Sequence, residues 1–200
     1  MSNLIYTKVI TEKNSVDLAA EMLKGIPGGY EQAMVSSLNR ALLEGRTAGT
    51  RAATARYTLP AGIIRGTMAQ HRASKSKLEA ELASRGRALP MRYYKHKPHT
   101  DTTGAKRQQA YVAIKKEGKL RPLWHRNRGG FIYHGSILRR VGDSSLPVVE
   151  VYSLAVPHIL NNQEIVDIVQ EKMRQSVIKR LEHETERLLR EGFVRKSKWS

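Results

Sequence analysis

Two groups of histidines have spacings that could support metal binding or metal-dependent nuclease chemistry. His96 and His99 lie in "HKPH", a spacing that occurs in metal sites, but no cysteine or carboxylate cluster completes a ligand set. His125, Asn127 and His134 lie in "WHRNRGGFIYH", which superficially follows the order of the His-Asn-His nucleases. The glycine pair and the short spacing leave no room for a ββα metal cradle. Neither group therefore predicts a metal site.

A pair of carboxylates, Asp143 and Glu150, could bind Mg²⁺, which prefers oxygen ligands. No lysine follows Glu150 in the Glu-x-Lys arrangement of restriction-type nucleases, so structural roles in a turn and a strand are favoured. The chain also has no glycine-rich phosphate loop, nucleophile elbow or helical His-Glu pair. The sequence therefore predicts a protein that is not an enzyme, with no catalytic residue, no metal and no cofactor.

Composition excludes further chemistry and directs attention to charge. The chain has no cysteine, which removes disulfides, thiolate metal sites and thiol nucleophiles. Its formal net charge is +17, and residues 61–146 hold 19 basic and 5 acidic side chains, a net of +14. Such a field attracts nucleic acid or an anionic membrane without reading sequence, because phosphate neutralisation releases counterions whatever the base. A polyanion is the expected partner, and a merely solvated basic surface is the alternative.

Eight basic side chains are the candidates for contact with nucleic acid. Four belong to "KHKPHTDTTGAKR", residues 95–107, which has no periodicity and contains proline and glycine, so the sequence predicts a long mobile loop there. The other four lie on either side of the "FIYHGSIL" run. The eight candidates are Lys95, Lys97, Lys106, Arg107, Arg126, Arg128, Arg139 and Arg140.

Helical spacing dominates the first third of the chain. Asn14 or Ser15 is expected to cap a short helix that stops at Gly25, and a second helix is expected over residues 30–57. Pro60 begins a third, shorter helix over residues 61–74. The second helix presents a stripe rich in small residues, which suits packing against a sheet or a neighbouring subunit. That stripe comprises Met34, Leu38, Ala41, Leu42, Gly45, Ala48 and Ala52.

The middle of the chain is expected to form strands. Residues 76–86 alternate with a period of two, residues 88–94 continue as a second strand, and residues 109–126 form a hairpin around Glu117-Gly118, where glycine can take a positive φ. The next strand pair begins in "FIYHGSILRR". A β-favouring run then follows, delimited by Pro147 and Pro157.

A long C-terminal helix follows the strands. Asn161 and Glu164 form a capping box, and apolar residues continue along one face to Gly192, which gives a helix of about 45 Å. A helix of that length exceeds what the core of one globule needs, so part of its face is expected to contact another chain, with a solvated overhang as the alternative. The subunit-interface candidates are Ile165, Val169, Met173 and Leu181.

These elements predict an α+β fold with N-terminal helices, a mainly antiparallel sheet in the middle and the long C-terminal helix packed on the sheet. A single domain is expected over residues 1–200. No run approaches the ~18 apolar residues of a spanning helix, so no membrane partner is expected. The start also lacks a signal pattern, so we expect the protein to be made and used in the cytoplasm. The expected subdivisions are 1–25 (arm and short helix), 26–72 (helical part), 73–157 (basic β part with loop 95–107), 158–192 (C-terminal helix) and 193–200 (tail).

The chain resembles the minor tail protein Z, or tail completion, family of long-tailed bacteriophages. Three stretches carry the resemblance: "PGGYEQAMVSSLNRALLEGRTAGTRAATARY" with the following "IIRGTM", then "GGFIYHGSILRRVGDSSLPVVEVYSLAVPHIL", then the terminal helix. The most specific part is the basic turn with Arg139, Arg140 and Gly142, the "LPVVEVY" strand and the "SLAVPHIL" exit. The first dozen residues and the loop at 95–107 lie outside the resemblance.

The resemblance implies a structural virion protein that completes the head-proximal end of a tail or neck, assembled in the host cytoplasm. It implies a homo-oligomeric ring, most simply a hexamer, with terminator, tail-tube or neck proteins and phage DNA as neighbours, and it supplies no catalytic residue. On this reading the two prolines keep a short strand from pairing edge to edge. The loop is either a solvated surface or a tongue toward the ring's lumen. The alternative function is a free, sequence-independent basic nucleic-acid-binding protein.

Overall fold

The computed structural model describes residues 5–8, 13–98, 109–125 and 128–197. Its fold is mixed α+β, with small antiparallel sheets and a long C-terminal helix, which confirms the predicted fold class. Contacts divide the chain into two compact units, where one domain of consecutive segments was expected. We call residues 1–3, 50–67 and 85–160 the β-rich unit, and residues 4–49, 68–84 and 161–200 the helical unit. Each unit therefore combines segments that are distant in the sequence.

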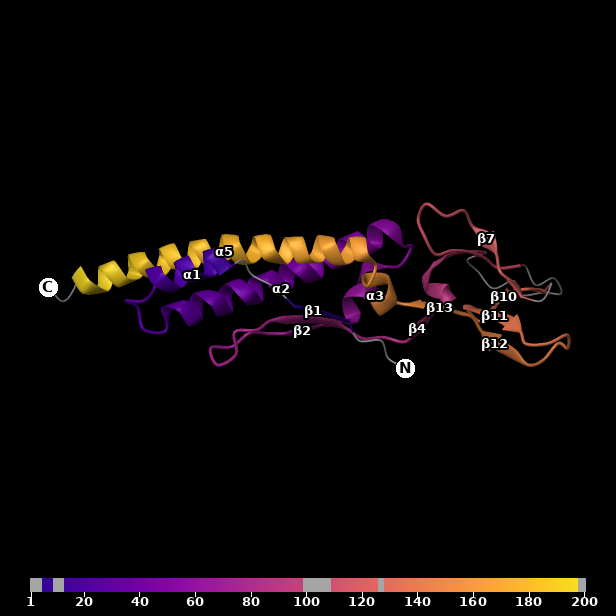
Figure 1. The fold of residues 1–200 in the computed structure, drawn as a ribbon. Helices are drawn as coiled ribbons and strands as arrows, with labels where there is room; N and C mark the ends of the chain where they lie inside the picture. The colour runs from indigo at the N-terminus through magenta and orange to yellow at the C-terminus, as the bar shows by residue number, and fades with distance from the viewer. Residues whose placement is uncertain (1–4, 9–12, 99–108, 126–127, 198–200) are drawn as a thin grey trace. The chain divides into compact units, whose positions relative to one another are not determined.

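The helical unit contains three helices and one small sheet among its described residues (Figure 1). Its sheet has the order β1-β3-β2 and is antiparallel throughout. Helices α1 and α5 contact each other, and α2 begins in this unit and ends in the β-rich unit. The elements are β1 (Ile5–Lys8), α1 (Lys13–Met22), α2 (Gly29–Arg56), β2 (Met68–His71), β3 (Glu81–Ser84) and α5 (Gln163–Ser197).

Small residues on α2 allow close packing in this unit. Gly45 faces Met173 of α5, and a Cβ at position 45 would also lie 3.6 Å from Leu82 of β3. Ser37 and Ala41 are completely buried on the same helix. The predicted stripe is buried from Met34 to Gly45 and half-buried at its last two alanines. Helix α2 thus packs against the sheet, as its composition predicts, and also against helix α5.

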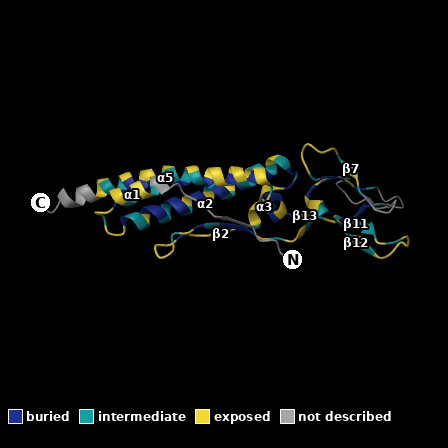
Figure 2. Cartoon of the chain, in the orientation of Figure 1, coloured by how far each residue is buried: buried dark blue, intermediate teal, exposed yellow. Residues whose placement is uncertain are grey.

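The buried residues of α5 explain how so long a helix packs. Ile165, Val169, Met173, Val177 and Leu181 follow one another at intervals of four, and all are at most 5% exposed. Buried and exposed positions alternate along α5 (Figure 2). With 3.6 residues per turn, each step of four advances the buried position by about 40° around the axis. The buried stripe therefore winds around α5, so the helix buries different sides along its length.

In its described part, the β-rich unit contains two short helices, a 3-10 turn and several small antiparallel sheets. The sheet orders are β10-β11-β12, β5-β6-β7, β13-β4 and β8-β9. Its elements are α3 (Ala61–Gly66), β4 (Ala88–Pro90), η1 (Met91–Tyr93), β5 (Lys95–Lys97), β6 (Tyr111–Ala113), β7 (Arg121–Pro122), β8 (Trp124–His125), β9 (Arg128–Gly129), β10 (Phe131–Tyr133), β11 (Ser136–Arg140), β12 (Val148–Glu150), β13 (Tyr152–Ala155) and α4 (Val156–Leu160).

Side-chain bonds to the backbone join the small sheets of this unit. Tyr94 is 2% exposed and its hydroxyl donates to the Leu154 carbonyl at 3.1 Å, while burial raises the pKa of that hydroxyl. Thr58 Oγ1 donates to the Ala113 carbonyl at 2.6 Å and accepts from the Lys95 N–H at 3.1 Å. These bonds satisfy polar groups inside a unit whose strands are too short to do so alone.

The third predicted helix is wrong over its second half. Helix α3 ends at Gly66, and residues 68–71 form β2, which pairs with β3 over four residues. Met68 is buried, Gln70 is half-buried, and the residues between and after them are exposed, which is the alternation of a strand. Only residues 81–84 of the predicted 76–86 strand are β-structure, because Ser74 and Lys77 form the turn of the β2–β3 hairpin.

The predicted strand and loop between residues 88 and 107 are also corrected. Strand β4 stops at Pro90 and is followed by the 3-10 turn of η1. The beginning of the predicted loop is strand β5, whose Lys95 and Lys97 pair with Ala113 and Tyr111 of β6. The bond from the Lys95 N–H to Thr58 helps to hold it in place. Residues 99–108 lie outside the described residues.

The hairpin predicted over residues 109–126 is confirmed by the pairing of β6 with β7, although its glycine plays another part. Gly118 donates its N–H to the Lys115 carbonyl without a positive φ. Positive φ occurs instead at His134 (47°) and Gly135 (69°), which join β10 to β11 as a primed turn. The strand pair predicted in "FIYHGSILRR" is confirmed.

The run between Pro147 and Pro157 is two strands rather than one. Strand β12 pairs with β11 and β13 pairs with β4, so the run changes sheets at Val151. Pro157 lies in the first turn of α4, where a missing N–H is tolerated. Asn162, not Asn161, caps α5: its Oδ1 accepts from the Glu164 N–H at 3.2 Å. Helix α5 continues past Gly192 to Ser197, and α1 begins at Lys13, before its two predicted caps.

Candidate polyanion-binding surfaces

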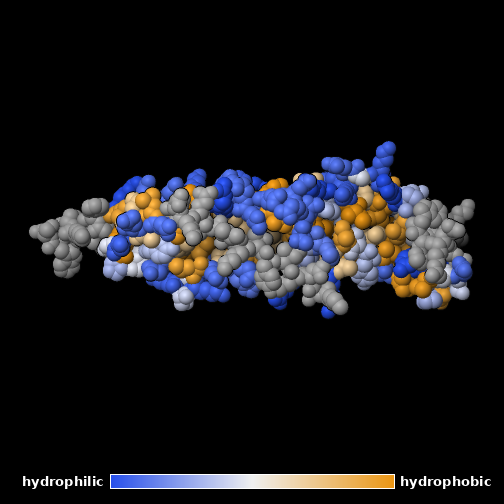
Figure 3. All heavy atoms as spheres, in the orientation of Figure 1, coloured by the Kyte–Doolittle hydropathy of each residue, from blue (hydrophilic) through white to orange (hydrophobic). Residues whose placement is uncertain are grey.

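The two units differ sharply in charge. The β-rich unit holds 18 basic and 4 acidic side chains, and the helical unit holds 17 and 14. The net charges are therefore +14 and +3, which together make the +17 of the chain. Exposed apolar side chains also interrupt the hydrophilic surface of the β-rich unit (Figure 3). An excess of positive charge on one unit is an electrostatic attraction for a polyanion.

Two of the predicted basic candidates share one face of the β5-β6-β7 sheet. Lys95 and Lys97 are exposed and two residues apart, so their side chains leave the same side of β5. Tyr111, which is 41% exposed, lies directly across from Lys97. Lys97 and Tyr111 line a surface hollow together with Pro98 and Gln109. An exposed ring beside an ammonium group is a combination that nucleic-acid-binding surfaces use.

The arginine pair of β11 does not act as one patch. Arg139 and Arg140 are consecutive residues of a strand, so their side chains point to opposite faces of the sheet. The Arg140 guanidinium lies 5.1 Å from the centre of the Phe131 ring, within cation–π range. Both arginines are half-buried. Neither presents its whole charge to solvent, which corrects the expectation of a shared basic turn.

Of the four remaining predicted basic candidates, three lie outside the described residues and one belongs to a strand. Lys106, Arg107 and Arg126 lie outside the described residues. The backbone of Arg128 is in β9, paired with His125 of β8. Sequence reasoning missed several exposed cations of the β6–β7 turn and of β7, although "KKEGKLR" shows them plainly as a basic turn. They are Lys115, Lys116, Lys119 and Arg121.

Glu150 and His96, two of the residues that could have supported chemistry, have structural partners. Arg92 donates to Glu150 at 3.2 Å and to Ser136 at 2.8 Å. The hydrogen bond from Tyr152 to Glu150 raises the pKa of that tyrosine. His96 Nδ1 lies 2.8 Å from the Tyr94 carbonyl. Among the described residues, no group of three or more histidine, cysteine, aspartate or glutamate side chains is arranged to hold a metal ion.

The four subunit-interface candidates are core residues of the single chain. Ile165, Val169, Met173 and Leu181 are between 1% and 5% exposed without any second copy present. They were expected to be buried partly within the subunit and partly against a neighbour, and one chain alone already buries them almost completely. They have almost no surface left for a neighbour, so a contact between copies would have to use other side chains of α5.

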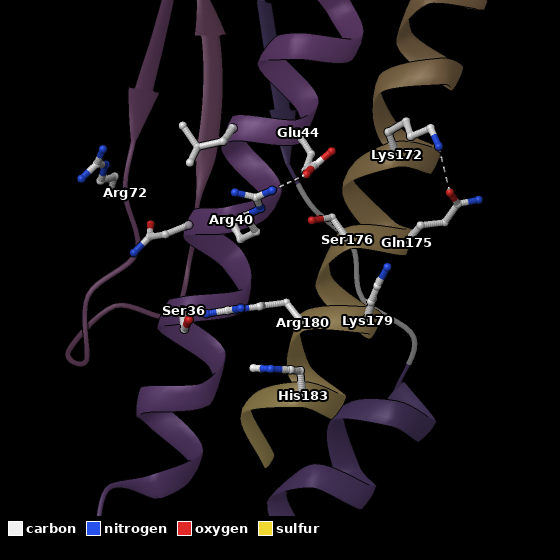
Figure 4. Close-up of a pocket in the computed structure, with 12 residues that line it drawn as sticks. Ser36, Arg40, Glu44, Arg72, Lys172, Gln175, Ser176, Lys179, Arg180 and His183 are labelled. Carbon is white, nitrogen blue, oxygen red and sulfur yellow. Dashed lines mark hydrogen bonds and ion pairs between the residues drawn. The ribbon is translucent and has the colours of Figure 1, made fainter. Parts of the chain in front are cut away.

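The helical unit has a basic groove that sequence reasoning did not find. It has a volume of about 840 Å³ and lies where α2 and α5 run side by side, with Arg72, just after β2, completing its wall (Figure 4). The spacing along each helix is that of one face, but nothing in the sequence shows that these two faces meet. Its lining residues are Ser36, Asn39, Arg40, Leu43, Glu44, Arg72, Lys172, Gln175, Ser176, Lys179, Arg180 and His183.

A buried carboxylate anchors this groove. Burial alone would raise the pKa of Glu184, but hydrogen bonds from Arg187 and Ser36, with the charges of Arg180 and Arg187, hold it below its ordinary value. The Glu184 oxygens lie 2.6 Å from Arg180, 2.9 Å from Arg187 and 2.9 Å from Ser36 Oγ. Because Ser36 is on α2 and Glu184 on α5, this network joins the two helices that form the groove.

Within the described ranges, no helix is long and apolar enough to cross a membrane. Comparison with protein families, curated proteins and solved structures finds no match to this chain.

Proposed function

We propose that this chain is a structural subunit of a bacteriophage tail. It completes the head-proximal end of the tail or the neck, forms part of a ring and contacts DNA without reading its sequence. The proposal assigns it no catalytic residue. The resemblance to the tail completion family supports it, and the stretches that carry the resemblance form α2 with α3, the run from β10 to α4, and α5. They therefore extend over both units.

The observation that carries the DNA contact is the separation of charge between the units. A net charge of +14 on the β-rich unit against +3 on the helical unit directs phosphate toward the first. The exposed Lys95 and Lys97 contribute to this field, as do the cations of the β6–β7 turn. No described helix of this unit exceeds six residues, apart from the end of α2, so the unit offers little that resembles a recognition helix.

Titration of the full chain with random-sequence duplexes at several salt concentrations tests this contact. We expect similar affinity for every duplex and a linear fall of log K with log salt, because counterion release dominates. Footprinting should show no preferred sequence. A preferred base sequence that survives at high salt would contradict sequence-independent binding.

The alternative, a free basic nucleic-acid-binding protein, is separated by size. A ring subunit should give a closed oligomer by native mass spectrometry, or should co-purify with tails. A chromosomal binder should remain a monomer or dimer and should be absent from purified particles. Recovery of the chain only on cellular nucleic acid would favour the alternative.

A further inference from the structure

The basic groove of the helical unit has a surplus of positive charge that its own residues do not neutralise. Arg40 pairs with Glu44 at 3.0 Å, and Arg180 pairs with the buried Glu184. Lys172 contacts the neutral Gln175 at 3.5 Å. With Arg72 and Lys179, the groove is lined by five cations and one carboxylate. Its occupant should therefore be acidic.

The chemistry of the lining favours a polypeptide over a nucleic acid. The lining contains no phenylalanine, tyrosine or tryptophan on which a base could stack, and the ring it does contain is the small imidazole of His183. Leu43 is 44% exposed in the groove and offers an apolar contact beside the cations. An acidic helix face with one exposed apolar residue would match this surface.

The chain itself carries such a face at the start of α5. Glu164, Asp167, Ile168 and Glu171 have the spacing of one helix side, and all four are exposed. Ile168 is 45% exposed among the three carboxylates. The segment from Gln163 to Glu171 contains no basic residue. Glu171 also pairs with Arg174 at 3.0 Å and accepts from Gln175 at 2.6 Å, so a contact through it has to compete with these bonds. With its three carboxylates the face has the opposite charge to the groove, and it has a comparable exposed apolar side chain.

The spacing of the charges also matches. Glu164 and Glu171 are seven residues apart, and so are Lys172 and Lys179, which is about 10.5 Å along a helix in each case. Each carboxylate of one copy can therefore face one ammonium group of another, with Ile168 near Leu43. A parallel register repeats head to tail, as a ring requires, and an antiparallel register closes a two-fold dimer.

We propose that the acidic face of α5, formed by Glu164, Asp167, Ile168 and Glu171, docks in the basic groove of a second copy of this chain. This contact rests on one part of the proposed function, namely that the chain is a subunit of an oligomer. It deepens that function by naming the surfaces through which subunits meet. Met173 and its buried neighbours hold α5 in place, while the exposed sides of the same helix make the contact.

Charge reversal on the full chain tests the contact, with the molecular mass measured by analytical ultracentrifugation over a range of concentrations. The basic-side variant is Lys172→Glu with Lys179→Glu, and the acidic-side variant is Glu164→Lys with Glu171→Lys. Each should weaken self-association by about tenfold or more, because like charges then face each other. The variant with all four changes should return to within about threefold of the unmodified chain, because opposite charges face each other again.

A matched control keeps the test specific. Lys24→Glu with Lys75→Glu makes the same change in net charge at exposed positions of the helical unit that do not line the groove, and should leave self-association unchanged. Thermal unfolding of every variant checks that the fold is retained. Restoration by the four-residue variant cannot result from misfolding, since it contains both sets of changes.

The outcomes separate this contact from the proposed function. Oligomers that resist both reversals would overturn the contact and leave the ring subunit standing on another interface. A chain that stays monomeric at every concentration would overturn both the contact and the ring. Loss of DNA binding in the basic-side variant, with association unchanged, would reassign the groove to nucleic acid and overturn the contact.

Discussion

Gly45 of α2 lies directly against Met173 of α5: a Cβ at position 45 would be 2.5 Å from the Met173 Sδ and 2.6 Å from its Cγ. Real Cβ atoms essentially never come so close to another heavy atom, so the missing side chain lets the two helices approach. Met173 itself is 1% exposed. The groove proposed as a contact between copies depends on this packing, because α2 and α5 form its sides.

The effect of Gly45→Ala on the free energy of unfolding should reverse when Met173 is replaced by alanine. In the unmodified chain the added methyl forces Met173 to move, which should lower the free energy of unfolding by about 1–3 kcal/mol. In a Met173→Ala background the clash is absent, and the same change should raise the free energy of unfolding by about 0.5–1 kcal/mol, because alanine is the better helix former. Urea denaturation of the four chains measures both steps. The same sign in both backgrounds would show that this contact does not limit residue 45.

The buried Glu184 should make stability depend on pH. Its folded pKa is below its ordinary value, so its stabilising effect is fully present above the unfolded pKa of about 4.3 and is lost as pH falls through the folded pKa. Glu184→Gln should lower the free energy of unfolding at pH 7 by about 1–3 kcal/mol, since charge-assisted hydrogen bonds are lost. The difference in the free energy of unfolding between the unmodified chain and this variant should become smaller below about pH 4. Denaturation curves at pH 7, 5 and 3 measure it, and a gap independent of pH would contradict the assignment.

The two arginines of β11 should differ in their effect on stability. Arg140→Ala removes the cation–π contact with Phe131 and should lower the free energy of unfolding by about 0.5–1 kcal/mol. Arg139→Ala, on the opposite face of the strand, should cost less than about 0.5 kcal/mol. Chemical denaturation of the two single variants compares them directly. Equal costs would mean that the ring contact contributes nothing measurable.

Regular periodicity made much of the fold predictable from the sequence. The extent of α2 followed from helical spacing that ends before Pro60, and the buried positions of α5 followed from apolar residues at intervals of four. The hairpin of β6 and β7 followed from turn residues between two β-favouring runs. In each case the decisive interactions are local, so a single stretch of sequence contains them.

Long-range pairing accounts for most of the errors. Residues 68–71 continue a helical pattern and become a strand only because β3 pairs with them. Strand β5 depends on Thr58, which is distant in sequence. The change of sheet at Val151 likewise depends on which strands lie on either side of it. No local pattern contains such information.

The candidate surfaces, too, could be predicted from the sequence only in part. The excess of cations in the middle of the chain is visible in the sequence, and the exposure of Lys95 and Lys97 agrees with it. The prediction that Arg139 and Arg140 form one basic patch was wrong, because adjacent residues of a strand point to opposite faces. The groove could not be predicted, since it exists only where Ser36 of α2 and Glu184 of α5 come together.

The contact between the β-rich unit and DNA can be tested by the salt dependence of DNA binding in two charge-matched variants. One variant changes cations of the β-rich unit, Lys95, Lys97, Lys119 and Arg121, to glutamine. The other changes exposed cations of the helical unit outside the groove, Lys24, Lys75, Lys77 and Arg190, to glutamine. Both lower the formal net charge from +17 to +13. Only their position differs.

We expect the slope of log K against log salt to become shallower by about 2–4 for the first variant, since each lost phosphate contact removes about 0.9. The second variant should keep the slope of the unmodified chain. Equal losses in the two variants would show that the attraction is spread over the whole chain. Unchanged slopes in both would contradict the assignment of DNA contact to the described cations of the β-rich unit.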